Sequence, residues 1–271
     1  MPEPDEYILG VDQEELDRLH FQHKVWTQAA YEVFQLAGLR AGHTVLDLGC
    51  GPGFTSFELA HVVGNDGRVI ARDQSARFLD FLRAECVRRS IHNIEASLGP
   101  VEELALAPDS IDAAYARWLF CWLPDPGRAL ALVARAVKPG GVIVLQEYFD
   151  WGSMRLMPAS DVFDRSVLAC MRSWHESGGR IDVAADVPAL ANDAGLRVAH
   201  FQPRARIGAV GSLEWRWLGA FFRSYLPRLV ERGSLRTSDF DAHEREWQAR
   251  TRADASFIYA PVMADVLLTK P

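Results

Sequence analysis

The chain has few of the features that mark secreted, membrane or metal-binding proteins. Its 271 residues include only four cysteines, which are scattered without a C-x-x-C pair. That spacing favours a reducing compartment and argues against a zinc site. No run of about 18 apolar residues is present, and the acidic stretch Met1–Glu6 lacks the apolar core of a signal peptide. We therefore expect a cytoplasmic protein with no membrane segment and no metal.

An excess of positive charge is also missing. The net charge is −7, from 29 Lys and Arg against 36 Asp and Glu. This balance argues against nucleic acid or an anionic membrane as a partner. One exception is residues 204–252, where ten arginines stand among six acidic residues. We interpret these arginines as the solvated faces of amphipathic helices.

The most informative stretch that is present runs from Val45 to Gly53 and reads VLDLGCGPG. A short apolar run contains one carboxylate, and three glycines then follow at every second position. The pattern predicts a buried strand, a tight turn and a helix that begins at Phe54. Free N–H groups at the start of such a helix suit a nucleotide-type ligand.

Two details of this stretch decide which nucleotide fits. The dinucleotide fingerprint G-x-G-x-x-G needs a third glycine where this chain has Phe54. Asp47 stands two residues before the first glycine, where its carboxylate repels a pyrophosphate and attracts an ammonium or sulfonium group. The pattern therefore favours a cationic, phosphate-free ligand over NAD.

The stretch resembles the first motif of class I methyltransferases that use S-adenosylmethionine (SAM). The resemblance covers most of residues 7–148 and includes the segment Leu123-Pro124-Asp125-Pro126. It implies SAM as cofactor and transfer of its methyl group to a small, partly apolar metabolite, on O, N, C or S. No Asn-Pro-Pro-Tyr motif is present, which makes nucleic acid and glutamine side chains poor acceptors. The sequence leaves the oligomeric state open.

Strand and helix patterns alternate along the chain. We expect helices over 13–37, 54–63, 75–90, 127–137, 160–177, 184–195 and 213–253, and strands over 43–48, 68–72, 94–98, 111–116, 142–147, 197–207 and 257–268. The alternation predicts an α/β, Rossmann-like, doubly wound and mostly parallel seven-stranded sheet with helical lid insertions. We expect a single domain over 1–271, with a helical cap at 1–41, a cofactor-binding core at 42–149, and lid helices and final strands at 150–271.

Candidate cofactor residues gather where the predicted strands end. Asp73 stands twenty residues after Gly53, where an acidic side chain hydrogen-bonds ribose hydroxyls. Pro100 replaces the acid with which the family contacts adenine, so adenine recognition falls to backbone near Val101 or to Glu102. In relatives, the backbone at the position of Arg117 meets the methionine part of the cofactor. The full set of expected cofactor contacts is Tyr7, Gln22, Asp47, Gly49, Cys50, Gly51, Asp73, Gln74, Val101, Glu102 and Arg117.

Trp118 and Trp122 are the candidate substrate-binding residues, since a spacing of four places both on one helical face and aromatic faces attract an S-methyl cation. A methyl acceptor that is a hydroxyl, a thiol or a protonated amine needs a general base. Glu147, at the end of the 142–147 strand, is the first candidate. His23, Asp150 and His175 follow it. Two alternatives remain open: a SAM-binding protein without methyl transfer, such as a cyclase or regulator, and an NAD(P)-dependent oxidoreductase.

Overall fold

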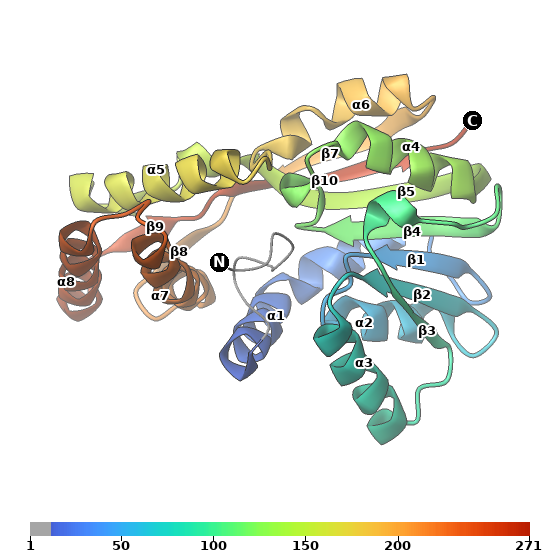
Figure 1. Cartoon of the computed structure of the whole chain (residues 1–271), viewed down its shortest axis with the longest axis horizontal. Helices are drawn as coiled ribbons and strands as arrows, with labels where there is room; N and C mark the ends of the chain where they lie inside the picture. The colour runs from blue at the N-terminus through green and yellow to red at the C-terminus, as the bar shows by residue number, and fades with distance from the viewer. Residues whose placement is uncertain (1–11) are drawn as a thin grey trace.

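The computed structural model describes residues 12–271, which are built around a seven-stranded sheet (Figure 1). Its strand order is β3-β2-β1-β4-β5-β10-β7, and β10 alone runs opposite to the other six strands. The strands are β1 (Thr44–Leu48), β2 (Arg68–Asp73), β3 (Ile94–Leu98), β4 (Ile111–Arg117), β5 (Val137–Asp150), β7 (Arg197–Arg204) and β10 (Val262–Thr269). The mostly parallel, doubly wound sheet predicted from the sequence is confirmed.

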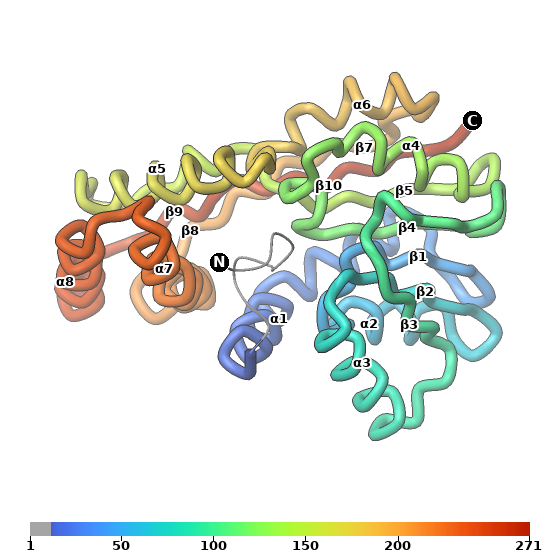
Figure 2. Tube along the Cα trace, in the orientation of Figure 1, coloured from blue at the N-terminus to red at the C-terminus, as the bar shows by residue number. Residues whose placement is uncertain are grey.

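Helices cover both faces of this sheet, as the tube view shows (Figure 2). On one face lie α1 (Gln13–Leu36), α2 (Phe54–Val63) and α3 (Ala76–Arg89), and on the other lie α4 (Pro126–Ala136) and α6 (Val187–Asp193). Central strand residues such as Leu46 and Val69 are fully buried, because a parallel sheet is covered on both sides. The crossovers therefore bring the carboxyl ends of β1, β2 and β4 to one edge.

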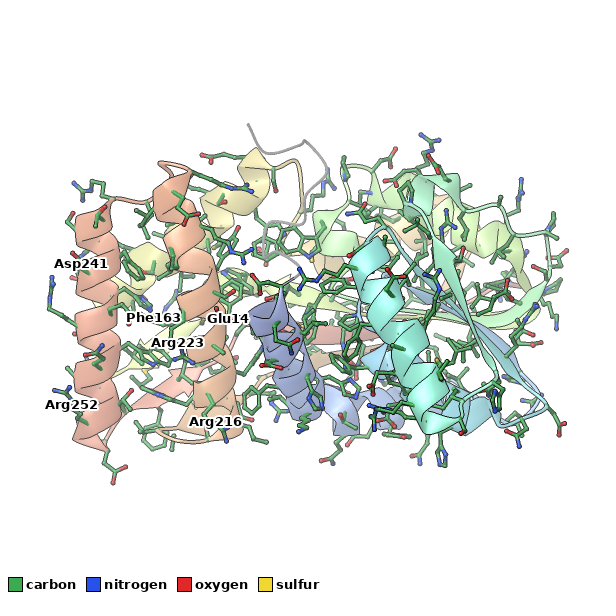
Figure 3. The ribbon with its side chains drawn as sticks, turned by 60° about the horizontal axis from the view of Figure 1, so that its bottom comes forward. Glu14, Phe163, Arg216, Arg223, Asp241 and Arg252 are labelled. Carbon is green, nitrogen blue, oxygen red and sulfur yellow. The ribbon has the colours of Figure 1, made fainter. Side chains whose placement is uncertain are left out.

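A second layer of helices extends beyond the sheet. It contains α5 (Asp161–Glu176), α7 (Leu213–Glu231) and α8 (Thr237–Ala253), with a small sheet of β6 (Arg155–Met157), β9 (Phe257–Tyr259) and β8 (Ile207–Ala209). In Figure 3, α7 lies between α8 and α1. The labelled Arg216 and Arg223 belong to α7. The rings of Trp26 on α1 and Trp217 on α7 meet edge-on at 5.4 Å. Aromatic packing thus joins this layer to the helix that flanks the sheet.

Some predicted boundaries are wrong. The helix expected over 127–137 ends at Ala136, and the strand expected over 142–147 already begins at Val137 and runs to Asp150. The region 213–253, expected to be helical, forms the two helices α7 and α8, and the strand expected over 257–268 divides into β9 and β10 at 260–261. The three-residue strands β6 and β8 were not predicted, since they are too short to show an alternating pattern.

In the part of the chain that the structure describes, no helix combines the length and apolar character needed to cross a bilayer.

Candidate functional site

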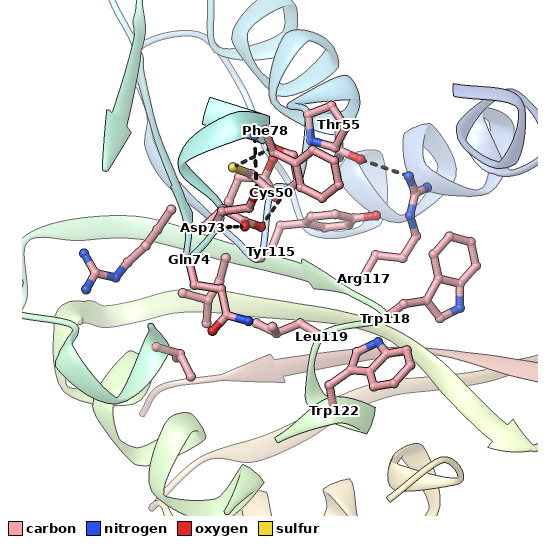
Figure 4. A pocket seen from close by; sticks show the side chains of 18 of the residues that line it. Cys50, Thr55, Asp73, Gln74, Phe78, Tyr115, Arg117, Trp118, Leu119 and Trp122 are labelled. Carbon is pink, nitrogen blue, oxygen red and sulfur yellow. Dashed lines mark hydrogen bonds between the residues drawn. The ribbon is translucent and has the colours of Figure 1, made fainter. Parts of the chain in front are cut away.

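A cavity of about 470 Å³ opens beside the carboxyl ends of β1, β2 and β4 (Figure 4). Its size is typical of small-molecule sites. Every predicted cofactor or substrate residue that the structure describes lies in its wall: Gln22, Asp47, Gly49, Cys50, Gly51, Asp73, Gln74, Val101, Glu102, Arg117, Trp118 and Trp122. Tyr7 falls outside the described residues. The predicted positions therefore converge on one cavity, and their individual roles remain predictions.

The glycine turn between β1 and α2 forms the floor of the cavity. Gly49, Gly51 and Gly53 have φ values of +66°, +54° and +82°, a region that side chains with a Cβ rarely adopt. A Cβ on Gly49 would lie 2.9 Å from a methyl carbon of Leu119. Glycine at these positions keeps the backbone close to the space that a ligand would fill.

Gly53 gives a direct test of this turn. A Cβ there would lie 2.3 Å from Cδ1 of Leu82, in addition to the strained φ. We expect Gly53→Ala to lower the free energy of unfolding by about 2–3 kcal/mol, as overpacking and a positive φ combine. Gly51→Ala is the matched control, since its Cβ would meet nothing within 4 Å. Equal loss in both variants, measured by urea denaturation, would contradict the packing part of this account.

Asp73, at the end of β2, holds the turn from the opposite side. Its Oδ2 accepts the N–H of Gly51 at 2.8 Å, and its Oδ1 accepts the N–H of Ser75 at 2.8 Å. Burial raises the pKa of this carboxyl, although the backbone N–H groups oppose the shift. Each oxygen keeps a second lone pair for a ligand donor. The geometry suits a carboxylate that binds hydroxyl groups at the cavity edge.

Asp47 is a carboxylate buried beneath the glycine turn. It is 2% exposed, and its Oδ2 accepts the hydroxyl of Ser56 at 2.5 Å. Burial raises its pKa to about 6, while Ser56 and then Arg117 act in the opposite direction. The ion pairs of residues 12–271 do not include Asp47. It is therefore a buried acid suited to a cationic ligand group.

Arg72 is a residue of the cavity wall whose contacts were not foreseen from the sequence. Its guanidinium donates to the carbonyl of Pro100 at 3.1 and 2.9 Å and to the hydroxyl of Ser97 at 2.9 Å. These bonds fix the short helix Val101–Glu103 beside the end of β2. Because these hydrogen bonds within the protein engage the guanidinium, it gives no support to a site for the 2′-phosphate of NADP.

Arg117 closes β4 and reaches across the cavity toward α2 (Figure 4). Its Nη2 donates to the hydroxyl of Thr55 at 3.0 Å and lies 3.1 Å from Nδ1 of His23 on α1. Its Nη1 is buried and has no hydrogen-bond partner among residues 12–271. Side chains from α1 and α2 therefore fix this guanidinium at the cavity wall.

The two tryptophans line the cavity, but the prediction that they share a helical face is wrong. Trp118 has a φ of +52° and precedes the short helix Phe120–Trp122, so no α-helix carries both. The indole N–H of Trp118 donates to the sulfur of Met263 at 3.0 Å. The ring of Trp122 stacks on Trp174 with 3.7 Å between centroids. Both rings are thus fixed by packing before a ligand arrives.

Glu147, the first candidate for a general base, does not line the cavity. It has no exposed surface, and its Oε1 accepts the N–H groups of Leu119 and Phe120, each at 2.8 Å. Burial raises its pKa to about 7, against these backbone bonds. The geometry gives Glu147 a positioning role, because it holds the loop that carries Trp118 into the cavity wall.

The other base candidates are no better placed. Asp150 and His175 are absent from the cavity wall, and Nδ1 of His23 faces a guanidinium donor. Thr55 and Leu119 are wall residues that the sequence did not single out. Position was the only sequence signal for them: Thr55 is the second residue of the predicted helix 54–63, and Leu119 follows the predicted 111–116 strand by three residues.

Comparison with known proteins places this cavity in context. Residues 46–145 match a family model described as a methyltransferase domain. The chain is 31% identical over 111 residues to arsenite methyltransferase of Halobacterium salinarum, covering 41% of this chain and 28% of that protein. It is 29% identical over 150 residues to the ubiquinone/menaquinone biosynthesis C-methyltransferase UbiE of Cellvibrio japonicus, covering 55% and 59%. The chain thus matches less than two thirds of the length of these relatives.

A solved structure shows the same fold over nearly its whole length. A putative methyltransferase from Bacillus halodurans superposes with a TM-score of 0.62 at 17% identity, covering 89% of this chain and 98% of the other. At that identity, the likeness concerns the fold. The matched segment 46–145 contains the glycine turn, Asp73 and Arg117, and thus much of the cavity wall.

Proposed function

We propose that this protein, whose residues 46–145 match a methyltransferase domain, is a class I methyltransferase that transfers a methyl group from SAM to a small, partly apolar metabolite. The observation that carries the proposal is the single cavity in which the glycine turn, Asp47 and Asp73 meet the two tryptophans. When bound, SAM supplies an electrophilic methyl group on its sulfonium sulfur. The acceptor atom is O, N, C or S.

The residues present fit this cofactor. The positive φ values of Gly49 and Gly51 bring the backbone of the turn to the cavity wall, and Asp47 places a buried carboxyl beneath it. Asp73 would hold the ribose hydroxyls, and Val101 and Glu102 line the side where adenine is expected. Asp47 would attract the cationic part of the ligand, because a buried carboxylate without an ion-pair partner is stabilised by an opposite charge.

The opposite end of the cavity is suited to the acceptor. Trp118, Trp122, Leu119 and Leu123 line it, and their apolar surfaces would exclude water from the reacting atoms. Methyl transfer is an in-line displacement, so orientation and desolvation are the main contributions of the protein. We do not assign the role of general base to Glu147, because its carboxylate accepts hydrogen bonds from backbone N–H groups outside the cavity.

We further propose that α1 and the helices after residue 150 act as the cap and lid of this core. The edge-on pair of Trp26 with Trp217 and the tilted pair of Trp118 with Trp217, which link α1, α7 and the cavity wall, support this division. A small-molecule acceptor, rather than nucleic acid, fits the net charge of −7. A cytoplasmic location fits the scattered cysteines.

The test is an acceptor screen with methyl-labelled SAM and a panel of small aromatic and aliphatic alcohols, amines, thiols and enolates. We expect labelled product together with S-adenosylhomocysteine from at least one class, and loss of the product in Trp122→Ala. Binding of SAM without product from any class would favour the alternative of a SAM-binding cyclase or regulator. That result would contradict methyl transfer while leaving the cofactor assignment in place.

A further inference from the structure

A groove of about 500 Å³ lies on a different face of α1 from the cofactor cavity. It runs between α1 and α7, which lie side by side in Figure 3, and residues of α8 complete it. No described residue lines both this groove and the cofactor cavity. The groove is therefore a separate surface, to which the proposed function gives no role.

Each wall of the groove is one face of one helix. Glu14 and Asp17 stand three residues apart on α1, and Arg216, Ala220 and Arg223 follow one another at spacings of four and three on α7. Residues three and four apart share a helical face. The groove thus has an acidic wall on α1 and a basic wall on α7.

The charges of the two walls do not pair with each other. All four charged side chains, Glu14, Asp17, Arg216 and Arg223, are exposed, and none of them belongs to an ion pair of residues 12–271. The ion pair that does join the start of α1 to α7 lies beyond the groove and uses other residues. Both walls therefore keep their charge for a partner outside the chain.

Aromatic side chains form the floor between the walls. Trp215 and Trp247 stack with 4.5 Å between ring centroids, and the guanidinium of Arg216 lies 4.7 Å from the ring centre of Phe21. Tryptophan, phenylalanine and arginine are enriched at the centres of protein interfaces, which a charged rim surrounds. The composition of the groove is therefore typical of a surface that another protein covers.

The arrangement of charge is self-complementary. A two-fold axis through the mouth of the groove would turn a second copy so that the acidic wall of each copy meets the basic wall of the other. A partner whose charge has one sign would be attracted by one wall and repelled by the other. A second copy of the chain satisfies both walls at once.

We propose that this groove is the two-fold interface of a homodimer, in which α1 of each copy lies on α7 of the other. Its aromatic floor supplies the apolar contact, and the two pairs of walls set the orientation. The interface is independent of the proposed methyl transfer, because the groove and the cofactor cavity share no described residue.

Sedimentation equilibrium of the full chain tests the interface. We expect a reversible dimer with a dissociation constant of about 1–100 µM, as for a small and partly charged interface. Association should weaken about 10-fold or more between about 0.05 and 0.5 M NaCl, because salt screens charges at an exposed rim. A wild type that stays monomeric at about 1 mM, well above this range, overturns the proposal.

Reversing the charge of one wall should disrupt the dimer. Arg216→Glu with Arg223→Glu makes both walls acidic, and Glu14→Arg with Asp17→Arg makes both walls basic. We expect each double variant to associate at least about 100-fold more weakly, because every contact between walls becomes repulsive. Unchanged association in both double variants would place the contact elsewhere and overturn the proposal.

A charge-matched control lies on other helices. Arg128→Glu with Arg172→Glu makes the same change in net charge as the reversed basic wall, at exposed positions of α4 and α5 outside the groove. This control should dimerise as the wild type does. An equal loss in the control would show a general effect of charge and would contradict the groove as the interface.

Mixing the two reversed proteins separates a lost interface from a damaged fold. The variant with two acidic walls and the variant with two basic walls should form a heterodimer, since both contacts then join opposite charges again. The chain with all four substitutions should likewise dimerise with itself. Either recovery also shows that the variants are folded, and failure of both recoveries overturns the proposal. These measurements need no SAM, so they stand whether or not the proposed function fails.

Discussion

Asp73→Ala is expected to weaken binding of S-adenosylhomocysteine by about 100-fold or more. The ribose hydroxyls would lose a charged acceptor, and each hydrogen bond to a charged group contributes roughly 1.5–3 kcal/mol. The turn would also lose support, since Oδ2 of Asp73 accepts the N–H of Gly51. Calorimetric titration of the purified variant measures the loss. The expected size makes this the largest single effect on cofactor binding in the cavity.

A matched variant separates binding from folding. Asp66 is exposed in the turn at the amino end of β2, whereas the cavity lies at the carboxyl end of that strand, and Asp66→Ala should bind as the wild type does. Circular dichroism should show that Asp73→Ala keeps its secondary structure. Unchanged affinity in a folded Asp73→Ala would contradict the ribose assignment.

Glu147→Ala is expected to lower the free energy of unfolding by about 2–4 kcal/mol. The N–H groups of Leu119 and Phe120 would lose a buried acceptor, and the missing side chain would leave a cavity. Glu147→Gln keeps an oxygen for both N–H groups, so its loss should be much smaller. Urea denaturation of the two variants side by side measures the difference.

The pH dependence of stability gives a second readout for Glu147. Its pKa rises from 4.5 to about 7 in the folded state, so the folded protein binds the proton more tightly than the unfolded chain. The stabilisation is therefore fully present below pH 4.5 and is lost as the pH rises through about 7. Asp47, with a pKa raised to about 6, adds a change of the same sign. Glu147→Gln should flatten the decline in unfolding free energy between pH 5 and 8.

One outcome for Glu147→Gln would support the sequence-based prediction that Glu147 is a general base. If Glu147→Gln keeps its stability and its affinity for S-adenosylhomocysteine but loses all methyl transfer, a base role for Glu147 is supported. We expect transfer to persist, because Glu147 has no exposed surface and lies outside the cavity wall.

The cofactor side of the cavity was predictable because its residues follow strand ends. A parallel sheet brings those ends together, so Asp47 and Asp73 had to meet once the alternation of strands and helices was read correctly. The glycines added the local turn, since positive φ values need residues without a Cβ. The local glycine pattern and the rule that parallel strand ends meet at one edge were thus sufficient to predict the residues of the cofactor side.

The rest of the cavity depends on contacts between distant parts of the chain. Nothing near Arg117 in sequence indicates that His23, 94 residues earlier, would meet its guanidinium. Glu147 looked accessible because it ends a strand, but Leu119 and Phe120 fold back over its carboxyl. The bond between Trp118 and Met263 likewise spans 145 residues. Such pairings follow from tertiary packing, which local patterns do not contain.

Calorimetric titration of the full chain with S-adenosylhomocysteine, and in parallel with NADH, tests the central claim most directly. The account predicts saturable binding of S-adenosylhomocysteine and no heat of binding with NADH, because Asp47 and Phe54 stand where a dinucleotide site needs other residues. Binding of NADH without binding of S-adenosylhomocysteine would contradict the cofactor assignment and the methyl transfer that depends on it.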